Sequence, residues 1–147
     1  MVSAEAYNGS YVKNPFNFKH YNIDNVALVV NETVVGGQPL SVNFNATKAE
    51  GRDYVAAYNH MFSGTGTQGK DFGNNITIDD FAKGYGLFCF NLEQFTNPGQ
   101  YFNLVKTGFV RLSIKFHEPL PETIVLIVYT EHQDMFQVDA ARNVLVG

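Results

Sequence analysis

The sequence predicts a mainly β protein organised around one antiparallel sheet. In residues 108–116, apolar and polar side chains alternate strictly apart from Phe109, a period typical of a strand with one buried face. Residues 122–130, ETIVLIVYT, form an apolar β-branched run, typical of a central strand covered on both faces. Pro119 and Pro121 separate the two runs, because proline lacks the N–H that a ladder needs. We therefore expect the two runs to pair with each other in the core sheet.

The composition limits the classes of function. The chain has 147 residues, enough for one domain with a sizeable core. Aromatic residues make up 14% of it and charged residues only 16%, which indicates that another molecule covers part of the surface. The net charge of −4 argues against direct nucleic-acid binding, which needs a basic face. The single Cys89 cannot form an internal disulfide.

Targeting signals are not evident in the sequence. No apolar run reaches the roughly 18 residues that span a bilayer. The first residues lack the basic and apolar regions of a signal peptide, so we expect a product that is not secreted. Four N-x-S/T sequons are accordingly interpreted as accidental, at Asn8, Asn31, Asn45 and Asn75.

The pattern divides the chain into a lead and a single domain. Residues 1–13 are small and polar and predict a flexible lead, and residues 14–147 form the domain. In the first part of the domain, runs separated by turn residues predict three strands. These strands are residues 16–22, residues 26–35, and residues 40–45 with Leu40, Val42 and Phe44 facing one way.

Helical segments interrupt the strands. Residues 46–62 show three-to-four spacing, with Thr47 and Glu50 as a capping box and Gly64 as the stop. A second helical turn is capped by Thr77 and closed by Gly84. The residues of the first helical stripe are Tyr54, Val55, Tyr58, Met61 and Phe62.

The last predicted strands are spaced unevenly along the sequence, like those before them. Residues 85–93 predict a strand, and Met135, Phe136 and Val138 precede a final short apolar run. About seven unevenly spaced strands with helical insertions are typical of an antiparallel β-sandwich of jelly-roll type rather than of a regular sandwich.

The glycine-rich loop at residues 64–70, GTGTQGK, resembles a phosphate-binding loop. Such a loop works when it follows a strand and opens a helix, whose backbone N–H groups meet the phosphate. Here it follows a predicted helix, and Asp71 stands where a Ser or Thr would hold magnesium. We interpret it as a flexible surface loop.

No other pattern predicts catalysis, a cofactor or a metal. His20, His60, His117 and His132 lack partners at ligand spacing. Neighbouring Asp79 and Asp80 diverge on a helical turn and are explained by the charge of a helix N-terminus. Cys89 lies in an apolar run and is interpreted as a small hydrophobe. The sequence predicts a protein that is not an enzyme.

Taken in order, four stretches resemble the C-terminal jelly roll of double jelly-roll major capsid proteins, most closely those of Polinton/Maverick elements and adintoviruses. The stretches are NPFNFKHYNIDNVALVVN (14–31), GRDYVAAYNHMFSGTG (51–66), GYGLFCFNLEQF (84–95) and the closing strands of residues 108–144. The most specific part is a hydrophobic strand ending in Val-Tyr, followed by an acidic turn and an apolar residue two places before an Asp. A member of that family has two jelly rolls, whereas this length holds at most one.

The resemblance implies a structural capsid module of a DNA virus or virus-like element. It implies a virion protein, assembled in the host nucleus or cytoplasm, that forms trimers and contacts other capsid subunits. Recognition then falls on aromatic side chains and sheet edges, because these dominate interface energies. The loops at 63–75 and 97–99 are expected to contact subunits or face outward. The expected interface residues are Phe16, Phe18, Tyr54, Tyr58, Phe62, Tyr85, Tyr101 and Phe102.

Three alternatives stay open. A binding module for carbohydrate or protein would use Tyr54, Tyr58, Tyr85 and Tyr101 to stack on sugars. A metal enzyme of the cupin kind would have to use His20, His117 and Glu118, whose spacing fits poorly. A capsid domain retained by a host for another role would share the same sequence pattern.

Overall fold

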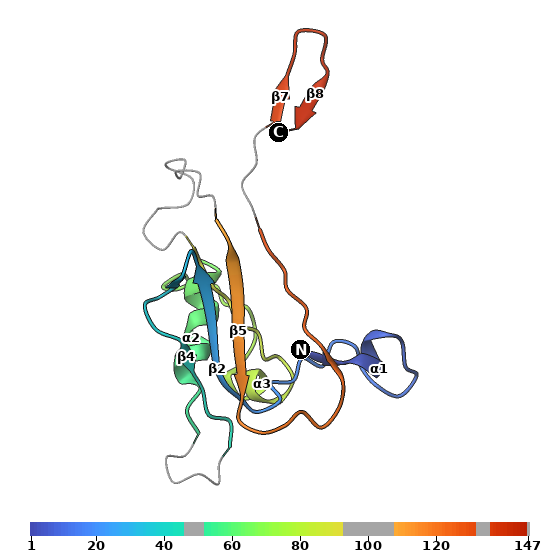
Figure 1. The fold of residues 1–147 in the computed structure, drawn as a ribbon, viewed down its shortest axis with the longest axis vertical. Coiled ribbons are helices and arrows are strands. Elements are labelled where there is room, and N and C mark those ends of the chain that lie inside the picture. Colours follow the sequence, from blue (N-terminus) through green and yellow to red (C-terminus); the bar gives the residue numbers. More distant parts are fainter. Residues whose placement is uncertain (46–51, 93–107, 132–135, 147) are drawn as a thin grey trace.

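The computed structural model describes residues 1–45, 52–92, 108–131 and 136–146. The described residues form a mainly β structure with antiparallel sheets and three short helices (Figure 1). One sheet has four strands, and two further sheets have two strands each. None of the described helices is long and apolar enough to cross a membrane.

The strand β2 (Ile23–Val30) is the centre of the four-stranded sheet. On one side it pairs antiparallel with β5 (Val110–Phe116), from Ile23 opposite Phe116 to Val30 opposite Val110, with a register shift between Ile23 and Asn25. On the other side it pairs with β3 (Thr33–Val34) and β4 (Leu40–Ser41). The strand predicted at residues 108–116 is thus confirmed, but its partner lies near the start of the chain.

A tight hairpin joins β2 to β3. Asn31 and Glu32 have φ values of 47° and 68°, and Val30 pairs with Thr33 directly across them. Two left-handed residues between paired strands make the turn whose twist matches a hairpin. The single strand predicted over residues 26–35 is therefore wrong, because the chain reverses in its middle.

The same turn fixes the start of β5. The side-chain oxygen of Asn31 accepts a hydrogen bond of 3.1 Å from the backbone N–H of Phe109. The Asn31 side chain also occupies the space that a Cβ atom at Gly108 would fill. A larger residue at position 108 would therefore require the Asn31 side chain to move.

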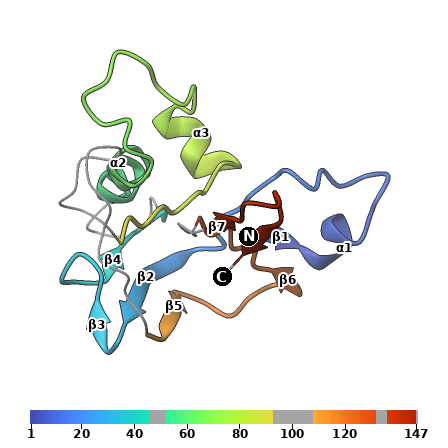
Figure 2. The ribbon, with the colours of Figure 1, turned by 90° about the horizontal axis from the view of Figure 1, so that it is seen from above.

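The two faces of the β2–β5 pair differ, as the alternation in the sequence predicts. Leu112, Ile114 and Phe116 are half-buried and pack against the core. Arg111, Ser113 and Lys115 are exposed on the other face. Helices α2 (Val55–Gly64) and α3 (Ile78–Lys83) cover the core side (Figures 1 and 2).

The first helix is shorter than its predicted extent. The helix α2 begins at Val55, and its N-cap residue Tyr54 makes no side-chain capping bond. The predicted capping residues Thr47 and Glu50 lie outside the described residues. Val55 is exposed instead of joining the buried stripe, and Gly64 is the last helical residue.

The second helix agrees with its prediction. Thr77 caps α3: its hydroxyl accepts from the Asp80 N–H at 3.2 Å, and the Asp80 carboxylate accepts from the Thr77 N–H in return. Gly84 is the C-cap residue. This capping box satisfies two backbone donors that would otherwise lack partners at the helix start.

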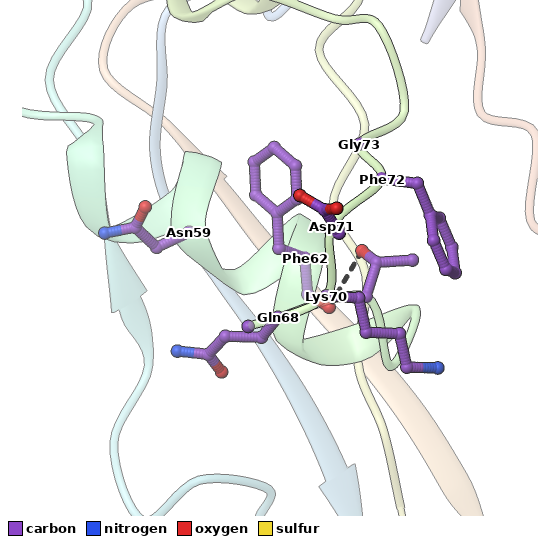
Figure 3. Close-up of a pocket in the computed structure, with 9 residues that line it drawn as sticks. Asn59, Phe62, Gln68, Lys70, Asp71, Phe72 and Gly73 are labelled. Carbon is purple, nitrogen blue, oxygen red and sulfur yellow. Dashed lines mark hydrogen bonds between the residues drawn. The ribbon is translucent and has the colours of Figure 1, made fainter.

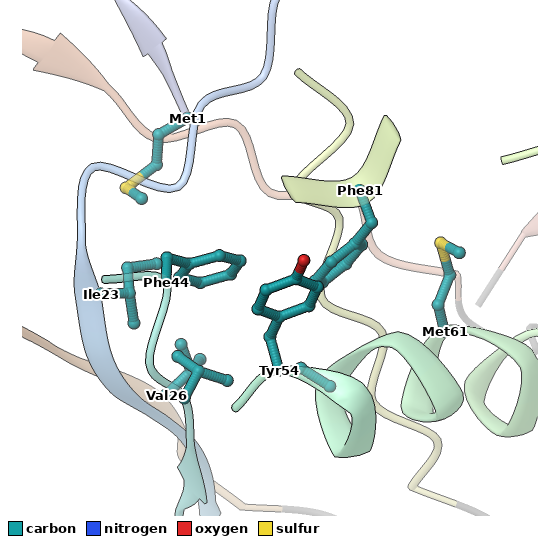
Figure 4. Packing of buried hydrophobic residues seen from close by; sticks show 9 residues of the cluster. Met1, Ile23, Val26, Phe44, Tyr54, Met61 and Phe81 are labelled. Carbon is teal, nitrogen blue, oxygen red and sulfur yellow. The ribbon is translucent and has the colours of Figure 1, made fainter. Parts of the chain in front are cut away.

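Aromatic rings fill the space between sheet and helices (Figure 4). Phe81 of α3 is completely buried, with ring centroids 6.2 Å from Phe44, 6.3 Å from Tyr54 and 5.8 Å from Phe88. Phe44 and Tyr54 are stacked at 5.0 Å. Val42 and Phe44 are both buried, as the predicted facing of residues 40–45 requires, although β4 itself covers only Leu40 and Ser41.

Two of the predicted strands do not form in the described residues. Residues 16–22 contain left-handed Tyr21 and Asn22, with φ values of 47° and 49°, which break a strand. Residues 86–92 are irregular, and the region is tied to the N-terminal part by the isolated bridge between Phe18 and Tyr85. Half-buried residues such as Phe88 and Phe90 instead pack against the helices.

The N-terminal residues are part of the fold. The predicted flexible lead at residues 1–13 contains β1 (Val2–Ser3) and α1 (Ala4–Tyr7). Val2 is only 1% exposed, and the Ser3 side chain caps α1 by accepting from the N–H of Ala6. The short, polar composition that suggested a lead is therefore misleading, because burial of Val2 anchors the segment.

The C-terminal part differs most from the prediction. Only Ile124–Val125 of the apolar run form a strand, β6, and its partner is β1 rather than β5. Further on, β7 (Phe136–Val138) and β8 (Val144–Val146) pair as a hairpin. In the described part of the chain, this hairpin packs against no other helix or strand.

We expect Phe81→Ala to lower the free energy of unfolding by about 3–5 kcal/mol, because it removes a fully buried ring and leaves a cavity. Urea unfolding measures the loss. The exposed Phe16 offers a matched control, whose replacement by Ala should change stability by less than about 0.5 kcal/mol. Equal losses in both variants would contradict the placement of the core.

Candidate functional site

Residues 126–129, hereafter the apolar segment, form an exposed run of large hydrophobic side chains. Their exposed fractions rise from 45% for Leu126 to 86% for Tyr129. Residues 126–131 belong to no strand and make no backbone hydrogen bond to another described residue. An exposed patch of this kind is typical of an interaction site.

The start of the apolar segment is held in place by the N-terminal residues. Val125 pairs with Val2, and the Ala4 N–H donates to the carbonyl oxygen of Thr123 at 2.9 Å. Just before it, Glu122 accepts from the Tyr21 hydroxyl at 3.0 Å and lies 3.3 Å from the Lys13 ammonium. These contacts fix where the apolar segment leaves the fold.

The contacts among Tyr21, Glu122 and Lys13, hereafter the anchor, shift the pKa values of Glu122 and Tyr21. The hydrogen bond from Tyr21, and then the contact with Lys13, hold the pKa of Glu122 below its usual range. Burial, followed by the bond to Glu122, raises the pKa of Tyr21 to about 12. Both shifts favour the pair of an ionised carboxylate and a neutral phenol at neutral pH.

The strand β5 presents an open edge. It pairs with β2 on one side, and no described residue pairs with its other side. Arg111 is exposed on this strand, whereas Lys115 forms an ion pair of 2.9 Å with Asp24. An unpaired edge is a template for another strand. In Figure 1 the chain that follows β6 runs back in the direction opposite to β5.

The predicted interface residues fall into different environments. Phe16 is 72% exposed and Tyr85 49% exposed, so both are available to a partner. Phe18 is half-buried where it bridges to Tyr85. Tyr101 and Phe102 lie outside the described residues.

The other three predicted interface residues belong to the core. Tyr54 is buried, and Tyr58 and Phe62 are half-buried with rings in edge contact at 5.1 Å. The Tyr58 hydroxyl donates to the carbonyl oxygen of Ile76 at 2.8 Å. Tyr54 and Tyr58 are therefore also unavailable to stack on a sugar, which removes two of the four tyrosines that the carbohydrate alternative would use.

The exposure of the apolar segment is not predicted by its sequence pattern. A β-branched run without a polar face predicts burial between two layers, whereas residues 126–129 are exposed and lie outside any strand. No pattern in the sequence separates an exposed apolar run from a buried one here.

The glycine-rich loop folds over the end of α2 (Figure 3). The N–H groups of Thr67 and Gln68 donate to the Phe62 carbonyl oxygen at 2.9 Å and 3.2 Å. In Figure 3 the Lys70 amino group lies on the side of Phe72, away from the Asp71 carboxylate, and it is 5.6 Å from the Phe72 ring centroid. The loop follows a helix, and the non-helical residues 71–76 separate it from the start of α3, so it lacks the geometry of a phosphate cradle.

The residues that a metal site would use, His20, His117 and Glu118, lie in different environments. His20 stacks on Phe44 at 3.8 Å, and burial lowers its pKa. His117 is exposed, and the Glu118 carboxylate accepts from the Asn22 side chain. Among the described residues, no group of three or more His, Cys, Asp or Glu side chains is placed to hold a metal ion.

Cys89 packs against the core, where burial raises its thiol pKa. A Cβ atom at Gly64 would lie 2.6 Å from its Cβ, so the end of α2 approaches it closely. This environment favours the neutral thiol rather than a reactive thiolate.

Comparison with known protein families finds no match, and neither does comparison with solved structures. The chain is similar to a Caenorhabditis elegans protein described as uncharacterized protein F54H12.2, with 33% identity over 149 residues. The similarity covers 99% of this chain and 34% of that protein, so the chain spans about a third of the relative's length.

We expect Glu122→Gln to lower the pKa of Tyr21 from about 12 towards 10.0, because it removes the carboxylate while burial remains. Ultraviolet titration of the phenol, with Tyr21→Phe identifying its signal, measures the shift. An unchanged Tyr21 titration would contradict the contact.

The loss of folding stability at acidic pH gives a second test of the contact between Tyr21 and Glu122. The pKa of Glu122 is depressed in the folded chain, so its stabilising contribution is present above the ordinary value of 4.5 and is lost as the pH falls through the lower folded value. In the Tyr21→Phe variant, the free energy of unfolding should therefore fall less below pH 4.5 than it does in the original chain. Urea unfolding at several pH values measures the difference.

Proposed function

We propose that this chain is a structural module that assembles with other protein subunits, as a capsid domain does, and that it carries out no catalysis. The observation that carries the proposal is the apolar segment: four consecutive large apolar side chains lie exposed directly after β6, which is paired with β1. Leaving such a surface in water is unfavourable, and its burial against a partner stabilises an assembly by roughly 25 cal/mol for each Å² covered.

The mainly β, antiparallel architecture supports the finer proposal of a jelly-roll capsid module. The order of the four stretches that resemble double jelly-roll capsid proteins adds to it. On this proposal the chain is one half of a double jelly roll or a split part of it, and it acts in a virion that assembles in the host nucleus or cytoplasm.

A second candidate is a capsid domain retained by a host genome. The similarity to part of a Caenorhabditis elegans protein favours it, because an animal protein about three times as long carries a related stretch. A retained module of this kind would keep the association surface, while its partners would be host proteins.

We expect the purified chain to self-associate, with a trimer or larger species appearing as its concentration rises. Light scattering across a hundredfold range of concentration would measure the mass. Burial of apolar surface favours the associated state, so the self-association should weaken on cooling. A mass of 16.4 kDa at every concentration would contradict the proposal.

A further inference from the structure

We propose that the apolar segment of one copy adds as an antiparallel strand to the open edge of β5 in a second copy. The inference rests on the proposed function, since it names the partner and the contact through which the module would assemble. It joins the two unpaired features of the described fold: a strand edge with free backbone groups, and an extended segment whose own backbone groups have no described partner.

Charge determines the register. Glu131 is exposed shortly after the apolar segment, and Arg111 lies exposed near the start of β5. In an antiparallel pair, residues directly opposite lie on the same face. Placing Glu131 opposite Arg111 brings Leu126 opposite Phe116 and Val128 opposite Ile114.

That register also continues the core. Ile114 and Phe116 are two of the half-buried sheet residues that pack against the core. Leu126 and Val128 of the added strand would extend this apolar row by one strand and cover its outer side. A shift of the register by one residue is unfavourable, because it would move Glu131 to the apolar face, opposite Val110 or Leu112.

The anchor explains why the partner is a second copy rather than β5 of the same chain. Residues 122–125 are held by the pairing of β6 with β1 and by the contacts of Glu122 with Tyr21 and Lys13. Moving the segment onto its own β5 edge would have to break these contacts. A second copy can bring its edge to the segment with the anchor intact.

The contact has a consequence for symmetry. The edge and the segment are different surfaces, so the contact is heterologous and repeats from head to tail. Such contacts close into a ring when the rotation permits, and a ring of three would satisfy every edge and every segment.

The experiment measures self-association of the full chain by light scattering. Arg111→Glu and Glu131→Arg each place like charges opposite each other, and each should weaken self-association roughly tenfold. The double variant R111E/E131R restores opposite charges with the partners exchanged, and it should return to within about threefold of the original chain. Arg52→Glu, a charge reversal at an exposed position outside the contact, should leave association unchanged.

A second pair of variants tests the apolar row. Val128→Asp should weaken association at least as strongly as either charge reversal, whereas Val12→Asp, at an exposed position near the N-terminus, should not. Urea unfolding of dilute samples checks that all variants keep the fold of the monomer.

The outcomes separate this inference from the proposed function. If the chain associates but none of the contact variants weakens it, or the double variant is as weak as the sum of its parts, the strand contact is wrong and assembly uses another surface. If the chain stays monomeric throughout, both fail. A monomer whose residues 126–131 are protected from exchange would show pairing within one chain, which also overturns the inference.

Discussion

The antiparallel ladder between β2 and β5 is the interaction on which the rest of this structure depends. It joins residues 23–30 to residues 110–116, more than half the length of the chain apart, and forms the sheet against which the aromatic cluster packs. Long-range pairing of this kind has a large loop-closure cost, which only burial of an apolar face can offset. The hydrogen bond from Phe109 to Asn31 ties the hairpin turn to the start of β5, so turn and ladder support each other.

The sequence predicts local features well where one short pattern determines them. The alternation in residues 110–116 gives the strand and its faces, and Thr77 with Gly84 gives both ends of α3. Partners are harder to predict, because alternation states that a strand has a buried face but not which strand lies beside it. Residues 122–130 show the limit: their composition suits a central strand, yet the structure leaves most of them exposed.

The candidate site is predicted only in part for the same reason. Phe16 and Tyr85 lie at the surface as an interface requires, whereas Tyr54, Tyr58 and Phe62 are needed inside. An aromatic residue can serve either a core or an interface, and spacing alone does not separate the two roles. The N-terminal residues illustrate the converse, since Val2 anchors β1 in a segment of polar composition.

Hydrogen exchange of the backbone in residues 108–131, followed as the protein concentration rises, tests the central claim most directly. The account predicts that amides of residues 126–131 exchange rapidly in dilute samples and become protected together with the outward-facing amides of β5 in concentrated ones. A strand contact between copies would be contradicted if these two sets of amides stayed unprotected at every concentration. It would also be contradicted if their protection were equally strong at every concentration.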